Sequence, residues 1–384
     1  MPTTDADQNS RDTPSGPLAG VRVLDLSTIG PGPFATMLLA DMGADVVCVR
    51  RPSGSEMIGT IVDRGKRTVP LDLKTASGLA SAWQLIEAAD VVIEGFRPGV
   101  MERLGLGPES ALGRNPRLIY ARITGWGDSG PLSQRAGHDI NYIALAGALA
   151  AIGRPDGEPT PPLNLIGDYG GGSLYLVFGI ACALIHRNKS GQGQVVEAAM
   201  IDGVASLMAN RADKVARDRG SLRGQDHLDG SAHYYRSYRC ADGAYITVGA
   251  IEPAFYHLLW STLGWADRDD LPTQDETDWE RGIQILSGVF VQQPRSYWDR
   301  LFADTDVCYS PVLPIEESFN HPQIRQRDVY VHRHDVWQPN VAPRLSGSPG
   351  EIQGPPNLMH AVLSEVLEEW TRLPAGRAPE ETKW

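Results

Sequence analysis

The chain has 384 residues, 42% hydrophobic and 21% charged, and its 35 basic and 47 acidic side chains give a formal net charge of -12. This length predicts two or three domains with ample apolar residues for their cores. The acidic balance argues against nucleic acid as a partner, and it requires a local basic cluster for any anionic ligand. No CxxC pair occurs among the four cysteines, so we expect free thiols, no metal centre and a cytoplasmic location.

Two segments bear on targeting and membranes. Residues 1–17 are polar and lack the apolar run of a signal peptide, so we expect a disordered tail there. The most apolar run, 174–185, is shorter than the roughly 20 residues that cross a bilayer. Its glycine and cysteine content predicts a buried core helix, and we expect no membrane partner.

Strands and helices alternate along the first third of the chain. Residues 21–26 alternate as a strand does, and 31–42 predict a helix with prolines near its start. A second strand is predicted at 45–50. The pattern continues with strands at 68–73, 90–96 and 118–124 and helices at 75–88 and near 108–112. This alternation predicts the α/β class, with a large Rossmann-like open sheet joined by right-handed crossovers.

The pattern changes after residue 124. A turn-rich stretch precedes helical patterns at 139–152 and 172–187, and a strand is predicted at 194–198. The expected division of the chain is a tail at 1–17, a large domain at 18–210, a linker at 211–233, a smaller α+β domain at 234–325 and a return segment at 326–384 that completes the large domain.

Two glycine-bearing motifs place an ionisable side chain where a helix is expected to begin. Gly137–Tyr142 contains His138, and Gly167–Gly172 contains Asp168. An imidazole can accept a proton near neutral pH, and the apolar run before Asp168 predicts a raised carboxyl pKa. The plainer interpretations are a helix-start histidine and a helix N-cap. The consecutive glycines after Tyr169 suggest that something approaches the backbone closely, for example an enolate or thioester oxygen.

Basic residues follow three of the predicted strands. Arg50 and Arg51 follow the second strand, Lys74 the third and Arg97 the fourth, with Arg103 about one helical turn later. Ligands of open α/β sheets bind beyond the carboxyl ends of the strands. Each basic residue taken singly is explained by solubility, but together they predict an anionic ligand. The segment 30–33 lacks the G-x-G-x-x-G fingerprint, so we do not infer NAD.

The two motifs closely resemble those of α-methylacyl-CoA racemases, a branch of the family III CoA-transferase superfamily. The resemblance runs from residue 17 to about 349 and includes 249–256. It implies that His138 and Asp168 are the two acid/base residues, with Glu252 of the small domain beside them. It implies CoA contacts at Arg51, Leu71, Asp72, Leu73, Lys74, Gly95, Phe96, Arg97, Arg103, Gly137, His138, Asp139, Ile140, Asn141 and Tyr142.

The resemblance also implies an assembly and a reaction. It implies an interlocked homodimer that interconverts (2R)- and (2S)-2-methylacyl-CoA thioesters through an enolate. CoA is then the carrier part of the substrate, and no cofactor is expected. Two alternatives stay open: a family III CoA-transferase with Asp168 as covalent nucleophile, and a non-catalytic CoA-binding protein. The Asp168 position is shared with the transferases, so His138 is the residue that favours the racemase.

Overall fold

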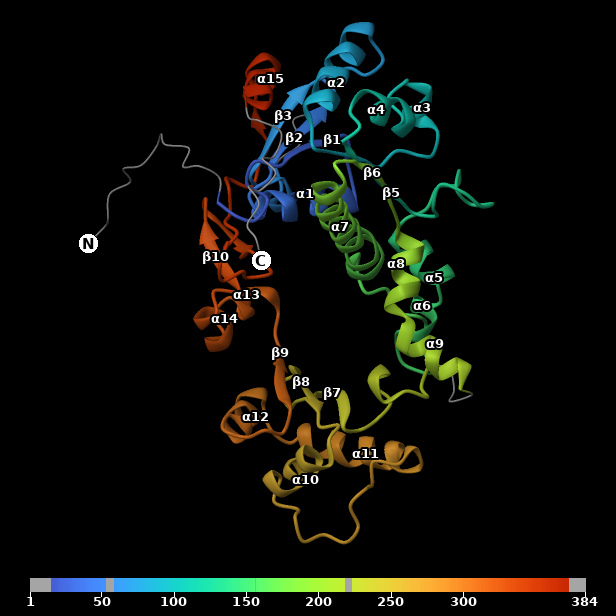
Figure 1. Ribbon diagram of the computed structural model, residues 1–384. Coiled ribbons are helices and arrows are strands. Elements are labelled where there is room, and N and C mark those ends of the chain that lie inside the picture. Colours follow the sequence, from blue (N-terminus) through green and yellow to red (C-terminus); the bar gives the residue numbers. More distant parts are fainter. Residues whose placement is uncertain (1–14, 53–58, 156, 218–222, 373–384) are drawn as a thin grey trace, which may run out of the picture. The chain divides into compact units, whose positions relative to one another are not determined.

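The computed structural model describes residues 15–52, 59–155, 157–217 and 223–372 (Figure 1). The chain forms two compact units. Unit 1 comprises Met1–Ala146, Leu163–Leu207 and Val329–Trp384, and unit 2 comprises Gly147–Pro162 and Met208–Asp328. Most of the expected tail lies outside the described residues. These units differ from the expected domains, because 147–162 groups with the smaller unit, whose second part runs from Met208 to Asp328 instead of 234–325. The expected linker at 211–233 begins inside a helix, α9 (Ala209–Ala216).

A seven-stranded parallel sheet forms the centre of unit 1, in the order β12-β3-β2-β1-β4-β5-β6. Its strands are β1 (Arg22–Asp25), β2 (Asp45–Arg50), β3 (Lys66–Pro70), β4 (Val91–Glu94), β5 (Ile119–Thr124), β6 (Gln194–Ala199) and β12 (Met359–His360). The predicted open α/β sheet is confirmed. The third strand lies at 66–70 instead of 68–73, because β3 pairs with β2 from Lys66 to Pro70.

Helices cover both faces of this sheet (Figure 1). The helices α1 (Pro31–Asp41) and α7 (Leu174–Ser190) pack on one face, and α2 (Ala76–Ala88) and α15 (Leu363–Arg372) pack on the other. Val23 and Leu24, adjacent on β1, are fully buried in two different core clusters. Successive side chains of a strand point to opposite faces, so this is the double-layered core of a doubly wound sheet.

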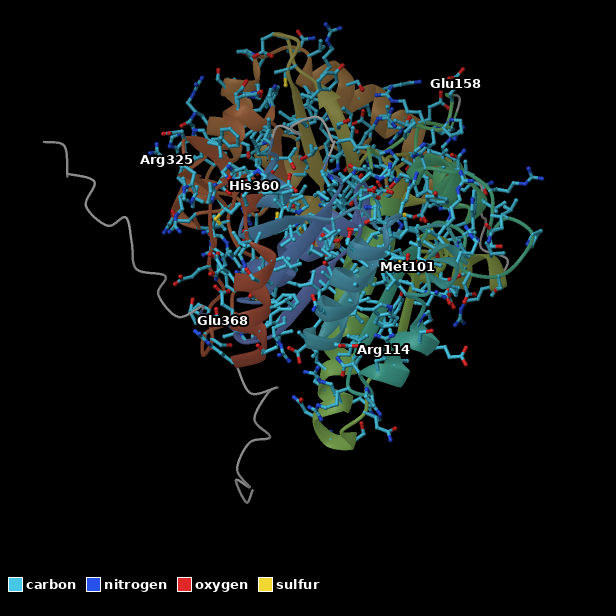
Figure 2. All side chains as sticks on the ribbon, turned by 90° about the horizontal axis from the view of Figure 1, so that it is seen from above. Met101, Arg114, Glu158, Arg325, His360 and Glu368 are labelled. Carbon is cyan, nitrogen blue, oxygen red and sulfur yellow. The ribbon has the colours of Figure 1, made fainter. Side chains whose placement is uncertain are left out.

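The C-terminal segment is an integral part of unit 1. β12 adds to the edge of the sheet beside β3, and Figure 2 shows His360 of β12 and Glu368 of α15 along that edge. Trp370 of α15 is fully buried in the core. The buried Arg64 pairs with Asp41 at 2.6 Å and donates a hydrogen bond to the carbonyl oxygen of Pro339.

Unit 2 is built on an antiparallel three-stranded sheet of β7 (Tyr235–Arg239), β8 (Tyr245–Gly249) and β9 (Tyr309–Val312). Its aromatic core draws on α10 (Pro253–Thr262), α11 (Trp279–Phe290) and α12 (Arg295–Phe302). Unit 2 also contains α6 (Ala148–Ala151), α13 (Ile315–Ser318) and α14 (Pro322–Gln326). Unit 1 also contains α3 (Val100–Arg103), α4 (Pro108–Arg114), α5 (Asp139–Leu145), α8 (Met200–Leu207) and the hairpin of β10 (Tyr330–Arg333) and β11 (Val336–Pro339).

The apolar run 174–185 belongs to a longer helix than expected. A π-helical stretch, Leu165–Ser173, continues into α7, so the helix spans Leu165–Ser190, 26 residues with a mean hydropathy of 1.4. By length and composition alone it could cross a membrane, and only 39% of its most apolar stretch is buried. The expectation of a short, buried helix is therefore wrong, because one face leaves Leu174, Phe178 and Ile185 exposed.

Candidate functional site

The site lies where the direction of strand order reverses. β2 and β3 follow on one side of β1 and β4 lies on its other side, so the switch point is between β1 and β4. Ligands of open α/β sheets bind at this point, beyond the carboxyl ends of the strands. The turn after β1 carries Gly30, and a methyl group added there would lie 3.8 Å from Oδ2 of Asp168. Asp168 is thereby placed at the switch point.

His138 stands at the start of α5, as the sequence predicts. Its backbone is extended, with φ -132° and ψ 175°, and its N–H donates a hydrogen bond to Oδ1 of Asn141 at 3.0 Å. This hydrogen bond, accepted by a side chain of the first helical turn, stabilises the start of the helix. Gly147, with φ 86°, separates α5 from α6, so the single helix expected at 139–152 is two short ones. The His138 side chain is exposed.

Asp168 is not the helix cap that the plainer interpretation predicts. It lies inside the π-helical stretch Leu165–Ser173, and the stretch begins after Asn164. π-Helical turns are rare overall, but those that occur often lie at functional sites. The wider turn changes the direction in which a side chain points. The Asp168 side chain is partly buried, and its carboxylate lies beside the turn that carries Gly30.

The three glycines after Tyr169 are explained by helix packing. A Cβ atom on Gly171 would lie 2.9 Å from the backbone nitrogen of Val204, and one on Gly203 would lie 1.9 Å from the carbonyl oxygen of Gly171. α8 therefore packs directly on the backbone of the π-helical stretch. The close approach predicted from the sequence is confirmed, and the group that approaches the glycine backbone in this structure is α8.

Two effects raise the pKa of Asp168 above its ordinary value. Burial of the carboxylate is the larger effect, and the negative charge of Asp139 is the second. A hydrogen bond from the Asn164 side chain and the proximity of His138 act in the opposite direction. The raised pKa agrees with the sequence prediction. The role of Asn164 was missed, although its position four residues before Asp168 places both on one side of a helical turn.

Tyr142 connects the two motifs to the basic cluster. It is 6% exposed, its hydroxyl donates a hydrogen bond to the carbonyl oxygen of Gly137, and Trp126 packs edge-on against its ring at 4.7 Å. Burial and the charge of Asp168 raise the pKa of Tyr142, and the charge of Arg97 lowers it. Tyr142 therefore lies within electrostatic reach of both Arg97 and Asp168.

The predicted basic residues lie beyond the carboxyl ends of neighbouring strands. Arg51 follows β2, Lys74 follows β3, Arg97 follows β4, and Arg103 ends α3; all four side chains are exposed. Leu71 differs from them, because its side chain belongs to the core of unit 1 and is 9% exposed. Most of the other residues implied to contact CoA are accessible: Gly95, His138, Ile140 and Asn141 are exposed, and Asp72, Leu73, Phe96 and Gly137 are partly buried.

Glu94 supports the loop that holds Arg97. It ends β4, is 4% exposed and accepts a hydrogen bond from the backbone N–H of Phe96 at 2.8 Å. Its carboxylate pairs with Arg122 at 3.2 Å, and burial raises its pKa to about 7.

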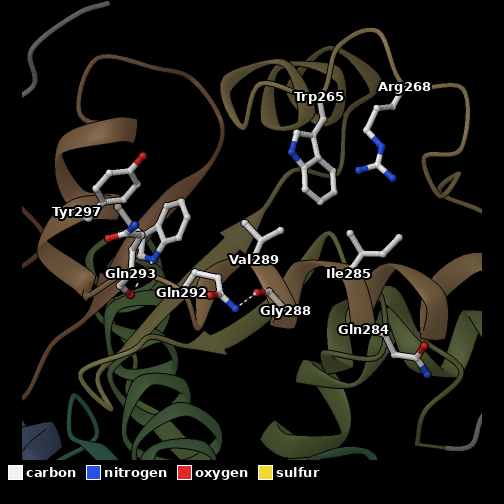
Figure 3. A pocket seen from close by; sticks show the side chains of 10 residues that line it. Trp265, Arg268, Gln284, Ile285, Gly288, Val289, Gln292, Gln293 and Tyr297 are labelled. Carbon is white, nitrogen blue, oxygen red and sulfur yellow. Dashed lines mark hydrogen bonds between the residues drawn. The ribbon is translucent and has the colours of Figure 1, made fainter.

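Glu252 lies in unit 2. It precedes α10, is exposed, and its charge raises the pKa of the nearby Cys308 after the larger effect of burial. A cavity of about 580 Å³ in the same unit is lined by Trp265, Ile285, Val289 and Tyr297 among others (Figure 3) and contains no predicted site residue. Within the described residues, no group of three or more His, Cys, Asp or Glu side chains is arranged to hold a metal ion.

The fold and the site define an open α/β protein with an imidazole and a carboxylate at its switch point. The family model for CoA-transferase family III matches residues 18–359. The chain is 44% identical over 337 residues to the alpha-methylacyl-CoA racemases of mouse and of human, covering 86% of this chain and 87% of each relative. It is 29% identical to human succinyl-CoA:glutarate CoA-transferase, over 93% of this chain and 86% of that relative.

Solved structures agree. A CAIB/BAIF family protein from Brucella suis superposes with a TM-score of 0.81 at 26% identity, covering 93% of this chain and all of that chain. Rv3272 from M. tuberculosis gives a TM-score of 0.77 at 27% identity, covering 92% and 98%. The chain therefore belongs to CoA-transferase family III, and the predicted family and fold are confirmed.

Proposed function

We propose that this protein is an α-methylacyl-CoA racemase that interconverts (2R)- and (2S)-2-methylacyl-CoA thioesters. The observation that carries the proposal is the presence of His138 and Asp168 at one site in a chain 44% identical to named racemases. His138 is the discriminating residue, since an aspartate alone also serves a transferase.

The reaction moves one proton off and one proton onto the α-carbon. One member of the pair removes the α-proton as a base, the electron pair enters the thioester as an enolate, and the other member donates a proton to the opposite face. The raised pKa of Asp168 favours its protonated form relative to an ordinary carboxyl group, which supports a role as acid as well as base. Backbone N–H groups at the start of α5 would stabilise the enolate oxygen. The thioester itself acidifies the α-hydrogen, so we propose no metal or redox cofactor.

The CoA portion of the substrate would be held by the basic residues at the strand ends. Arg51, Lys74, Arg97 and Arg103 are exposed and can form charge-assisted hydrogen bonds to phosphates. A local cluster of this kind is what a protein with net charge -12 needs for a polyanionic substrate. Tyr142 lies within electrostatic reach of both Arg97 and Asp168, which supports a substrate that extends from one to the other.

We further propose a homodimer, located in the cytoplasm and without a membrane or nucleic-acid partner. The exposed row of Leu174, Phe178 and Ile185 on α7 supports burial against a second copy, because a continuous apolar face is costly in water. In such a dimer Glu252 of one subunit would complete the site of the other. Mixing His138→Ala and Glu252→Gln chains tests this: heterodimers should regain activity at one intact site, and inactive heterodimers would refute the shared site.

The second candidate is a family III CoA-transferase with Asp168 as nucleophile, favoured by the similarity to succinyl-CoA:glutarate CoA-transferase. A third, a non-catalytic CoA-binding protein, is disfavoured by the intact ionisable pair. Incubation of one epimer of 2-methylacyl-CoA in deuterated solvent separates all three. A racemase yields the other epimer with one α-deuterium, a transferase yields a trappable acyl adduct on Asp168, and a binding protein yields neither.

A further inference from the structure

Asp139 follows His138 directly, yet its side chain turns inward. It is 7% exposed, whereas both flanking side chains are exposed. Its Oδ2 accepts a hydrogen bond from the backbone N–H of Asp168 at 2.7 Å. A single carboxylate thus joins the first turn of α5 to the π-helical stretch 29 residues further along the chain.

The contact is tight and leaves no space for another group. A Cβ atom on Gly167 would lie 2.6 Å from Oδ2 of Asp139, so a glycine is needed beside Asp168 for the carboxylate to reach its N–H. This contact explains why a glycine precedes Asp168 in the sequence motif, without a helix cap or a bound ligand.

The other oxygen of Asp139 has no partner. Oδ1 is buried and takes part in no hydrogen bond within the described part of the chain. A buried polar atom without a partner costs about 1 to 3 kcal/mol, so its retention calls for a function.

We propose that Asp139 is a positioning residue of the racemase pair: its buried carboxylate fixes Asp168 relative to His138 and places a second negative charge beside Asp168. The two carboxylates repel one another when both are ionised, so the Asp168 proton is held to higher pH. The raised pKa of Asp168, to which burial contributes first and Asp139 second, agrees with this arrangement.

The groups that face Asp168 from the neighbouring elements are few. Asp139 and His138 of α5 act on it by charge, and Asn164 by a hydrogen bond. α1, α7, α8, β5 and β6 also pack on the π-helical stretch, and none of their ionisable side chains is among these influences. Tyr142 of α5 is close enough for the charge of Asp168 to raise its pKa. Asp139 is therefore the carboxylate whose removal should alter the titration of Asp168.

The test compares Asp139→Asn with Asp139→Ala and with the exposed-site control Glu109→Gln. Asparagine keeps an oxygen for the Asp168 N–H and removes the charge. With the epimer whose α-proton Asp168 removes, the acid limb of the kcat/KM profile should therefore move to lower pH. Alanine also removes the acceptor, so kcat should fall at least about tenfold with little change in KM. Glu109→Gln should match the wild type in both respects. An unmoved acid limb in folded Asp139→Asn would overturn the proposal.

This inference rests on the proposed racemase reaction, and a second measurement separates the two. The titration midpoint of the Asp168 carboxyl is read by infrared difference spectroscopy against Asp168→Asn, which needs no turnover. It should fall in Asp139→Asn, and also in Asp139→Ser should the asparagine variant not fold. A wild type without racemase activity would refute the proposed function alone, whereas an unchanged midpoint would refute the role of Asp139.

Discussion

Gly30 lies beside the carboxylate of Asp168, because a Cβ atom added to Gly30 would stand 3.8 Å from Oδ2 of Asp168, in van der Waals contact. The backbone of Gly30 has φ 69° and ψ -132°, a conformation that glycine adopts readily and other residues do not. Gly30 therefore makes the turn after β1 possible and leaves Asp168 accessible at the switch point.

Gly30→Ala should lower both stability and activity. The unfavourable backbone conformation should cost about 1 to 3 kcal/mol of unfolding free energy, and the methyl group should occupy the approach to Asp168 and reduce kcat by about tenfold or more. Gly105→Ala is the matched control, because Gly105 also has a positive φ of 74° but no atoms within 4 Å of the added methyl. Equal kcat values for the two folded variants would contradict the placement of the site.

Arg97→Ala should weaken CoA binding mainly through KM. Loss of a charge-assisted hydrogen bond costs about 1.5 to 3 kcal/mol, which corresponds to a rise in KM of roughly 10- to 150-fold. The control Arg114→Ala removes an exposed arginine of α4 that pairs with Glu87, and its KM should stay unchanged. A fall in kcat with an unchanged KM for Arg97→Ala would speak against the anchoring role.

The raised pKa of Glu94 makes stability depend on pH. Its folded-state value of about 7 lies above the ordinary value of 4.5, so the folded protein binds this proton more tightly than the unfolded chain does. The contribution of Glu94 is therefore fully present below pH 4.5 and is lost as the pH rises through about 7. Urea denaturation of Glu94→Gln should show less decline over this window than the wild type. An identical decline would rule out titration of Glu94.

The buried pair of Arg64 and Asp41 should be important for the attachment of the return segment. Both side chains are 1% exposed, so Arg64→Met leaves an unpaired buried carboxylate and should cost about 3 to 5 kcal/mol of unfolding free energy. The exposed pair of Arg114 and Glu87 should contribute about 0 to 1 kcal/mol, so Arg114→Ala is the control. Denaturation in urea measures both, and equal losses would show that burial of the pair is unimportant.

The sheet of unit 1 could be predicted from local patterns. The pattern of 21–26 and the apolar run within 45–50 predict strands that the structure places at β1 and β2. Short runs dominated by apolar residues are typical of parallel strands that are buried on both faces. α8 was missed, because β6 runs into it at Met200 with no turn residue between them. The exposed face of α7 was also missed, since apolar composition does not say which surface covers a helix.

The two motifs were found from sequence, but their internal geometry was not. His138 begins α5 as predicted, whereas Asp168 lies within a π-helical turn, which depends on the packing of α8 against Gly171 and on no local signal. The inward turn of Asp139 was likewise unforeseen. The Asp139 side chain packs against Gly167, which is 28 residues further along the chain. A contact between residues so far apart leaves no periodic pattern in the sequence.

The central claim is that His138 and Asp168 each handle one face of the α-carbon. The most direct measurement is the inversion of one epimer of 2-methylacyl-CoA by His138→Ala and by Asp168→Asn in deuterated solvent, beside the wild type. Each variant should lose inversion, because every turnover needs both a base and an acid, and either one should at most exchange the α-proton of a single epimer with retained configuration. Full inversion by folded His138→Ala would contradict the two-base account.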